Sequence, residues 1–230
     1  MELEVTNLKK AYPNKSVLEG ISFKLQNNEI VGLLGRNGCG KSTLMKCITD
    51  LAGFNEGQIL FDGRMLEPAL MESIAYLPEQ SAIDTNWTGN QAISFYQDFY
   101  SDFDGHKAAK LANEMTIPLD QELKKLSKGM QEKLQLILIL SRKAKLYLLD
   151  EPLSGVDPQS RDQILDLILS QFDQEATILV STHLVADIER ILDRVLVMKE
   201  GQIFIDEPVE DLRNRMKMSV DAFVRSGGLL

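Results

Sequence analysis

The feature that most constrains this chain is a glycine-rich segment, GRNGCGKST, at residues 35–43. An apolar run, IVGLLG, leads into it, and KSTLMKCITDLAG, which has helical spacing, follows it and is expected to end as a helix at Gly53. A strand, a loop of the pattern G-x-x-x-x-G-K-[ST] and a helix in this order are typical of a P-loop, whose backbone N–H groups surround nucleotide phosphates. A glycine-rich turn with a chance Lys-Ser pair is the weaker interpretation, because it does not require the flanking strand and helix. We therefore predict an α/β fold built around a nucleotide site.

The residues of this P-loop have separate expected tasks. Lys41 is expected to reach the β- and γ-phosphates, and the Ser42 hydroxyl is expected to ligate Mg²⁺. Cys39 lies at the start of the helix near Lys41, and such neighbours lower the pKa of a thiol, so Cys39 is predicted to be reactive. The motif alone leaves kinases, GTPases and ATPases open. The candidate nucleotide-binding residues of the segment are Gly35, Arg36, Asn37, Gly38, Cys39, Gly40, Lys41, Ser42 and Thr43.

Two carboxylates end another apolar run, LYLLDEP, at residues 146–152. Behind a P-loop, Asp150 is expected to hold Mg²⁺ through water, and Glu151 is expected to act as a general base toward the attacking water. An acidic pair that merely ends a strand before a proline is the alternative, and the upstream P-loop argues against it. The two motifs together predict phosphate hydrolysis, with Lys41 and Glu151 as catalytic residues.

A histidine follows a third apolar run, ATILVSTH, at residues 176–183. A neutral imidazole at the carboxyl end of a strand can donate a hydrogen bond to a γ-phosphate, so His183 is a further candidate catalytic residue. By itself, a solvated loop histidine would be the favoured interpretation. That interpretation is kept for His106, in the polar segment FDGHKAA.

The segment LSKGMQEKLQL, at residues 126–136, has the pattern of a helix start. Ser127 can cap the helix, Gly129 leaves the backbone bare, and an apolar run follows. A bare helix N-terminus suits an anion, although the P-loop already provides a stronger anion site in the same chain. An ordinary capped core helix is a compatible interpretation, since Leu134, Ile137 and Leu138 would form a buried face.

Shorter patterns predict the remaining architecture. Residues 21–25 alternate as in a half-buried strand, and hairpins are expected at residues 62–63 and 200–201. Residues 88–141 lack strand patterning and are predicted helical, and residues 226–230 are expected to be loose. The expected fold is α/β, with a parallel core sheet, antiparallel strands on one side and a helical insertion in the middle. Its chemistry should lie at the carboxyl ends of the parallel strands.

Composition and charge limit the kind of protein. The 230 residues are 44% hydrophobic and 26% charged, as in an ordinary globular protein, and the net charge of −9 argues against a broad nucleic-acid-binding face. The longest apolar stretch, near residues 136–140, is far shorter than the ~20 residues that span a bilayer, and no signal peptide is expected. Cys39 and Cys47 show no metal-binding spacing and indicate a reduced cytosolic setting.

The P-loop, LSKGM, LLDEP, SGVD and STH occur in the order found in the ATP-binding subunit of an ABC transporter, which the chain resembles over nearly its whole length. The resemblance implies a single ABC ATPase domain over residues 1–230, with a P-loop NTPase core, an antiparallel β-subdomain and a helical subdomain inserted at about 88–141. It implies ATP and Mg²⁺ as cofactors and ATP hydrolysis coupled to transport. It also implies that Tyr12 stacks on adenine, with an ordinary exposed strand-end tyrosine as the alternative.

The same resemblance implies partners. Two ATPase units of that family pack head to tail, so Ser127 and Gly129 of one copy would face the γ-phosphate on the P-loop of the other. SGVD, at residues 154–157, resembles the loop that crosses between the two subunits. The expected partners are a second ATPase subunit, identical or different, and an integral membrane permease, but no nucleic acid. The permease would hold this cytoplasmic subunit at the inner face of the cell membrane.

The chain departs from the family pattern at two motifs. In LSKGM, Lys128 replaces a glycine and Met130 replaces a glutamine, which adds a positive charge and removes an amide. In YLPEQ, either Glu79 or Gln80 takes the place of the glutamine that senses the Mg²⁺ or the water. The glutamate form resembles the subgroup that serves drug, lipid or antimicrobial-peptide exporters, so export is expected over import.

Residues 87–103 are rich in aromatic side chains. Phe95 and Phe99 are four residues apart and share a helix face, and a small helical core is the favoured interpretation for them. Some of the others are candidates to line a groove for a cytoplasmic helix of the permease.

Two other functions remain open at this stage. The first is an ABC-type ATPase that works with a soluble partner, as in iron–sulfur assembly. The second is an ATP-gated dimer switch that does not hydrolyse ATP, against which the intact Glu151 argues. A small-molecule kinase is disfavoured, because it would need neither LSKGM nor STH.

Overall fold

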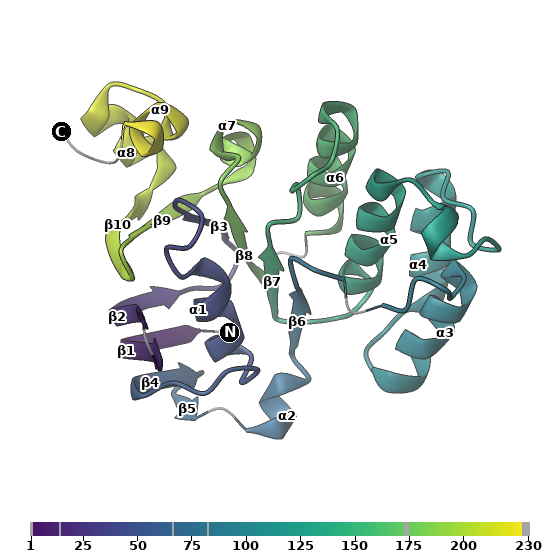
Figure 1. Cartoon of the computed structure of the whole chain (residues 1–230), viewed down its shortest axis with the longest axis horizontal. Helices are drawn as coiled ribbons and strands as arrows, with labels where there is room; N and C mark the ends of the chain where they lie inside the picture. Colours follow the sequence, from purple (N-terminus) through teal and green to yellow (C-terminus); the bar gives the residue numbers. More distant parts are fainter. Residues whose placement is uncertain (1, 14, 66, 82, 173–174, 227–230) are drawn as a thin grey trace.

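The computed structural model describes residues 2–13, 15–65, 67–81, 83–172 and 175–226. Within these residues the strands form two sheets (Figure 1). The smaller sheet is antiparallel, in the order β2-β1-β4-β5. Its strands are β1 (Leu3–Tyr12), β2 (Lys15–Leu25), β4 (Glu56–Phe61) and β5 (Arg64–Met65).

The larger sheet has the order β10-β9-β3-β8-β7-β6. Five of its strands are parallel, and β10 at the edge pairs antiparallel with β9. Every residue of β3, β7 and β8 is buried, which explains why these runs are apolar on both faces. Its strands are β3 (Ile30–Leu34), β6 (Ile74–Leu77), β7 (Leu146–Asp150), β8 (Thr177–Thr182), β9 (Arg194–Lys199) and β10 (Gln202–Pro208).

The predicted α/β fold, with a parallel core sheet and antiparallel strands on one side, is confirmed. The predicted hairpins are present, since residues 62–63 join β4 to β5 and residues 200–201 join β9 to β10. Because β3, β8 and β7 are neighbours, the segments that follow their carboxyl ends meet at one edge of the sheet.

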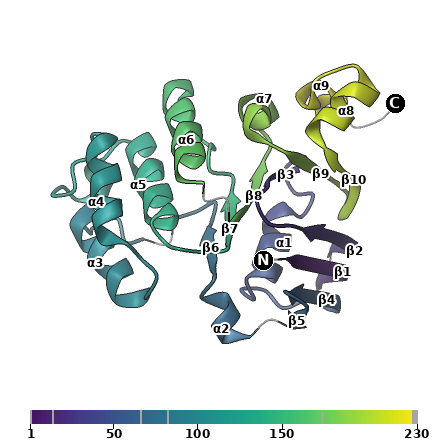
Figure 2. The same cartoon turned by 180° about the vertical axis from the view of Figure 1, so that it is seen from behind.

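Helix α1 (Lys41–Ile48) lies between the two sheets (Figure 2). Leu44, Met45 and Ile48 are buried in a core that both sheets share. The predicted end at Gly53 is wrong, because the helix stops at Ile48. Asp50 adopts a left-handed conformation with φ of 55°, and the N–H of Ala52 bonds back to the Lys46 carbonyl at 3.0 Å. An aspartate therefore ends the helix where a glycine was expected.

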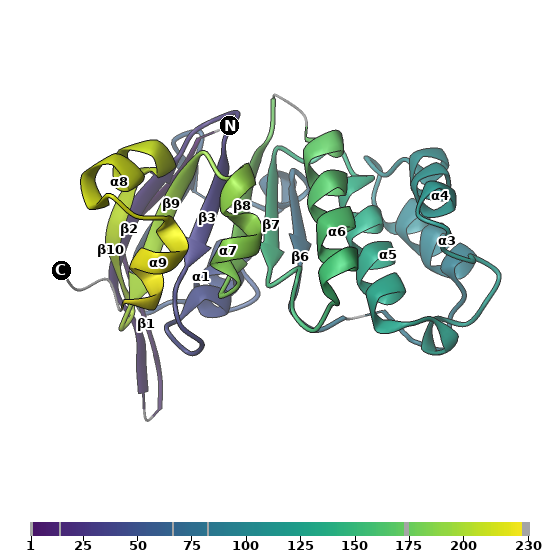
Figure 3. The same ribbon diagram turned by 90° about the horizontal axis from the view of Figure 1, so that it is seen from above.

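Residues 88–141 form helices between β6 and β7, as predicted. The helices are α3 (Gly89–Phe99), α4 (Gly105–Glu114), the 3₁₀ turn η1 (Leu123–Lys125) and α5 (Lys128–Leu140). Each α-helix begins at a polar cap, since the side chains of Thr88, Asp104 and Ser127 accept first-turn backbone N–H groups. Figure 3 shows α3 and α4 at one end of the molecule, opposite the C-terminal helices.

Arg142 ties this helical segment to the core sheet. Its buried guanidinium donates to the Ile74 carbonyl at 2.8 Å, at the start of β6, and to the Asp102 carboxylate at 3.0 Å. It also lies over the Tyr100 ring, 4.0 Å from the ring centroid. One side chain thus joins the end of α3 to the sheet edge.

The expectation that Phe95 and Phe99 form a small core is wrong. Their side chains are 42% and 71% exposed, although the rings stack with centroids 5.4 Å apart, as the shared helix face predicted. The inner face of α3 is occupied instead by Ala92, Ile93 and the partly buried Tyr96. The spacing identified the shared face, and the tertiary packing turned that face outward.

Most of the remaining helices cover the other face of the larger sheet or lie at the C-terminal end, and one short helix lies between β5 and β6. None of the helices in the described part of the chain is long and apolar enough to cross a membrane. Of residues 226–230, which were expected to be loose, only Ser226 falls within the described residues. These helices are α2 (Pro68–Met71), α6 (Pro158–Gln171), α7 (Val185–Ile188), the 3₁₀ turn η2 (Glu189–Ile191), α8 (Val209–Met216) and α9 (Val220–Arg225).

Candidate nucleotide-binding and catalytic site

A cavity of about 360 Å³ opens at the carboxyl edge of the larger sheet, over the P-loop. Six of the nine candidate P-loop residues line it, together with the general-base candidate and three other residues. The lining residues are Lys15, Val17, Asn37, Gly38, Gly40, Lys41, Ser42, Thr43, Glu79 and Glu151. Of the other candidates, Arg36 and Cys39 line a neighbouring hollow of about 550 Å³ beside the β9–β10 turn.

The P-loop conformation requires glycine at two positions. Gly40, directly before α1, has a left-handed φ of 112°, which strains any residue that carries a Cβ. At Gly35 the limit is space, because an added Cβ would lie 2.5 Å from the Met198 carbonyl oxygen. At these two glycines the loop packs closely against β2 and β9, and this packing fixes where the loop enters α1.

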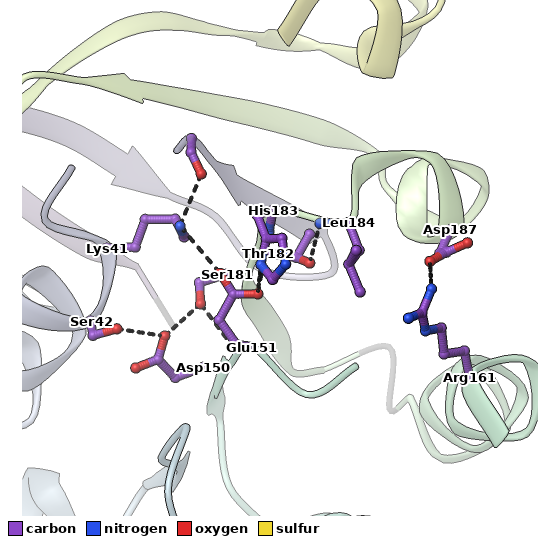
Figure 4. Close-up of polar contacts among 11 residues, drawn as sticks. Lys41, Ser42, Asp150, Glu151, Arg161, Ser181, Thr182, His183, Leu184 and Asp187 are labelled. Carbon is purple, nitrogen blue, oxygen red and sulfur yellow. Dashed lines mark hydrogen bonds and ion pairs between the residues drawn. The ribbon is translucent and has the colours of Figure 1, made fainter. Parts of the chain in front are cut away.

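Lys41 is buried and has protein partners in this structure. Its ammonium donates to the Gly35 carbonyl at 2.9 Å and lies 3.2 Å from the Glu151 Oε1 (Figure 4). The expected phosphate-binding lysine is therefore ion-paired with the expected general base. A phosphate at this site would compete with Glu151 for the same ammonium.

Asp150 is buried at the end of β7 and is surrounded by hydroxyl groups. Ser42 Oγ donates to its Oδ1 at 3.1 Å, and Ser181 Oγ donates to the same oxygen at 2.5 Å. The Tyr76 hydroxyl makes a longer contact of 3.4 Å to Oδ2, and burial, followed by the Asp150 charge, raises the pKa of Tyr76. No pattern in the sequence predicted Tyr76 or Ser181 as site residues. Both residues lie on strands that flank β7, so knowledge of the strand order would have identified them as neighbours of Asp150.

Glu151 follows β7 in a left-handed conformation with φ of 51°, which is rare for a residue other than glycine. Its backbone N–H bonds to the Ser181 carbonyl at 3.1 Å and to Ser181 Oγ at 3.0 Å. Its Oε2 lies 2.9 Å from His183 Nδ1 and accepts the His183 backbone N–H at 3.2 Å. This turn places the carboxylate between Lys41 and His183 (Figure 4).

The oxygen-bearing side chains at this edge of the sheet fit one hard metal ion, most of whose ligands would come from water and from the phosphates of a bound nucleotide. No cluster of three or more His, Cys, Asp or Glu side chains that could hold a metal occurs in the described part of the chain. The Ser42 hydroxyl and the Asp150 carboxylate meet at 3.1 Å beside the cavity, and oxygen donors of this kind suit Mg²⁺, which takes its other ligands from water and phosphates. Glu79 lines the cavity, whereas Gln80 is exposed and does not line it.

Tyr12 does not line the cavity. The residue is 46% exposed at the end of β1, and the Lys10 ammonium lies 4.8 Å from its ring centroid. His106 is exposed as expected, but it lies in the first turn of α4 and not in a loop.

Ser127 and Gly129, at the start of α5, also lie away from the cavity of their own chain. Ser127 caps α5 as predicted, accepting the Met130 N–H at 3.3 Å. Gly129 lies against the start of α6, since an added Cβ would be 3.0 Å from Ser160 Oγ. The Lys128 ammonium fills the space over Gly155, where an added Cβ would clash with it. The LSKGM and SGVD segments therefore touch within one chain.

The prediction of a lowered pKa for Cys39 is wrong. Burial of the thiol raises its pKa, and this effect outweighs the lowering effect of Lys41. The sequence placed the thiol beside a positive charge but did not show that the loop would partly bury it.

Comparison with known proteins agrees with this geometry. The family model described as "ABC transporter" matches residues 18–154. The chain belongs to the ABC transporter family. It is 31% identical over 228 residues to the ABC transporter ATP-binding protein YtrB of Bacillus subtilis, covering 96% of this chain and 78% of that protein. It is 27% identical over 214 residues to the lantibiotic transport ATP-binding protein SrtF of Streptococcus pyogenes, covering 92% and 93%.

Its fold matches that of a solved ATP-binding subunit of an ABC transporter, with a TM-score of 0.87, 27% identity, and 98% and 99% of the two chains covered. The predicted P-loop NTPase fold is thus confirmed for this ABC subunit. ABC ATP-binding domains bind and hydrolyse ATP, so the predicted ATPase class is confirmed as well.

Proposed function

We propose that this ABC subunit binds ATP with Mg²⁺, pairs head to tail with a second ATPase subunit around the nucleotide, and drives export through a separate membrane permease. The observation that carries the proposal is the placement of the Glu151 carboxylate beside Lys41 and of the Asp150 carboxylate beside Ser42, next to the P-loop cavity. The whole chain is proposed to act as one ABC ATPase domain, with residues 88–141 as its helical insertion.

The residues divide the work of hydrolysis. The P-loop N–H groups and Lys41 bind the phosphates, and Ser42 and Asp150 hold Mg²⁺, which neutralises charge on the transferred phosphoryl group. Phosphate binding draws Lys41 away from Glu151. The freed carboxylate, still held by the backbone N–H of His183, accepts the proton of the attacking water. His183 donates to the γ-phosphate, and Tyr12 stacks on adenine.

The head-to-tail pairing is supported by the position of α5. The first N–H groups of a helix lack partners within the helix and favour an anion, yet Ser127 and Gly129 do not line the cavity of their own chain. Nucleotide phosphates bound to the P-loop of a second copy would supply the anion that these N–H groups favour. Glu79, which lines the cavity, is the proposed sensor of Mg²⁺ and water.

The permease and the export direction are supported by the relatives. The Streptococcus pyogenes relative is named for lantibiotic transport, and a Bacillus subtilis relative that is 30% identical over 223 residues is named for linearmycin resistance. We propose that this subunit is cytoplasmic and lies at the inner face of the cell membrane through its permease. Co-expression with a candidate permease and purification in detergent tests this part, since a subunit that works with a soluble partner would not co-purify.

The ATP-bound pair can be tested with a slow hydrolysis variant. Glu151→Gln keeps the shape of the side chain but removes the base, which typically costs ~10²–10⁴-fold in rate. We expect this variant to be a dimer with Mg²⁺ and ATP and a monomer with ADP, measured by size-exclusion chromatography with light scattering. An ATP-bound variant that stays monomeric would contradict the proposed pairing.

A second substitution tests which surface forms the pair. Ser127→Arg, added to Glu151→Gln, places a bulky side chain at the start of α5 and should abolish the dimer while ATP still binds. Ser219→Arg is the matched control, because Ser219 is an exposed serine that caps α9 in the same way. A double variant with Ser127→Arg that still dimerises would mean that α5 is only a capped core helix.

A further inference from the structure

The Ser181 hydroxyl lies between the two carboxylate residues of the site (Figure 4). It donates to Asp150 Oδ1 at 2.5 Å and accepts the Glu151 backbone N–H at 3.0 Å. Its side chain is fully buried at the end of β8. One hydroxyl therefore contacts both the expected metal-holding residue and the expected general base.

The sheet register makes this contact specific. Parallel pairing of β7 with β8 sets Asp150 opposite Ser181, so the hydroxyl reaches across one strand spacing. A hydroxyl has one proton to donate. Because that proton goes to Asp150, the oxygen lone pairs remain to accept the Glu151 N–H, and the orientation of the group is fixed.

Each of the two bonds has a consequence for chemistry. Donation to Oδ1 at 2.5 Å holds that carboxylate beside Ser42, the other oxygen donor expected to bind Mg²⁺. Acceptance of the Glu151 N–H supports a residue whose φ of 51° is unfavourable for a side chain with a Cβ. That backbone conformation directs the Glu151 carboxylate toward Lys41 and His183.

We propose that Ser181 is a positioning residue, which couples the metal-holding carboxylate of Asp150 to the backbone conformation of Glu151. This inference rests on the proposed Mg²⁺-dependent hydrolysis at the same site. A serine that only supports the fold would affect stability and nucleotide binding equally with and without Mg²⁺. A positioning residue affects the Mg²⁺ response and the turnover number.

The test compares Ser181→Ala with the parent chain and with Ser141→Ala. Ser141 is the matched control, because its buried hydroxyl has no hydrogen-bond partner among the described residues. Binding of a fluorescent ATP analogue is measured in EDTA and in excess Mg²⁺, and ATP hydrolysis is measured across a Mg²⁺ titration. Thermal melting of each chain reports folding.

We expect Ser181→Ala to bind nucleotide in EDTA as the parent does, because the P-loop is unchanged. The gain in affinity on adding Mg²⁺ should shrink, the Mg²⁺ concentration for half activation should rise, and kcat should fall, each by about 10- to 100-fold, as for loss of a hydrogen bond to a charged group. The KM for ATP in saturating Mg²⁺ should change less. Ser181→Thr, which keeps a hydroxyl, should recover most of the Mg²⁺ response, and Ser141→Ala should match the parent.

Two results would overturn the inference. One is a Ser181→Ala chain whose Mg²⁺ response and kcat stay within twofold of the parent. The other is an equal loss of nucleotide binding in EDTA and in Mg²⁺, which would mean that the hydroxyl only supports the fold. Failure of the proposed function itself has a different signature, because the parent chain would then lack Mg²⁺-dependent hydrolysis.

Discussion

At the scale of single residues, the ion pair between Lys41 and Glu151 sets the starting state of the site. Both side chains are almost fully buried, with 5% and 6% of their surface exposed, and their charged atoms lie 3.2 Å apart. Removing one partner of a buried pair leaves an uncompensated charge, whereas a ligand phosphate can replace the lost partner. The nucleotide and Glu151 therefore compete for Lys41.

This competition predicts opposite effects of Glu151→Gln on the free and ADP-bound chain. The free chain should melt at a lower temperature, because Lys41 loses its counterion. ADP should bind roughly tenfold tighter than to the parent, since its phosphate no longer displaces a carboxylate and tenfold corresponds to ~1.4 kcal/mol. Calorimetric titration and thermal melting with ADP measure both effects without ATP-dependent pairing.

Glu210→Gln, at an exposed position of α8, serves as the control for the loss of one negative charge. Equal ADP affinity in the parent and Glu151→Gln would show that the ion pair does not oppose nucleotide binding.

At the scale of elements, Arg142 fastens the helical segment 88–141 to the sheet. It bonds to the backbone of β6 and to Asp102, and Asp102 is 22% exposed, so the pair is only partly shielded from solvent. Arg142→Ala should lower the free energy of unfolding by about 3–5 kcal/mol, as for removal of one partner of a buried ion pair. Urea denaturation followed by circular dichroism measures this change.

Lys143→Ala, at the exposed neighbouring position, should leave the free energy of unfolding within about 0.5 kcal/mol of the parent. If the two variants were equally stable, the segment would be held by its apolar contacts alone. The polar caps of α3, α4 and α5 act within each helix and are unchanged in both variants. They are therefore not expected to contribute to the difference in the free energy of unfolding.

At the scale of the whole molecule, helix α3, which carries the exposed Phe95 and Phe99, lies far from the C-terminal end (Figure 3). Trp87 contacts Phe95 with ring centroids 5.0 Å apart, and Phe95 stacks on Phe99. Aromatic side chains are enriched in protein interfaces, and the proposed permease would bind outside the nucleotide cavity. Phe95→Ser with Phe99→Ser should therefore abolish co-purification with the permease, while ATP binding by the isolated subunit stays at the parent level.

Phe204→Ser is the matched control, because Phe204 is 57% exposed on β10, at the opposite side of the molecule. Loss of the permease from this control, or its retention by the α3 variant, would place the contact elsewhere.

The sequence by itself determined the motifs and the elements that carry them. The P-loop needs only a strand, a short loop and a helix in order, and the two carboxylates directly follow a buried strand. Local signals of this kind depend on backbone conformation and side-chain periodicity, so they can be recognised without knowledge of the fold. The cap at Ser127 was visible for the same reason.

Only the tertiary structure decided which groups meet. Ser181 and Tyr76 reach Asp150 because β8 and β6 flank β7, and sheet order is a long-range property that no local pattern encodes. Partial burial of Cys39 and exposure of Phe99 also depended on packing partners distant in the sequence. Hydrophobic burial is not directional, so periodicity can define a face of a helix but cannot say what covers it.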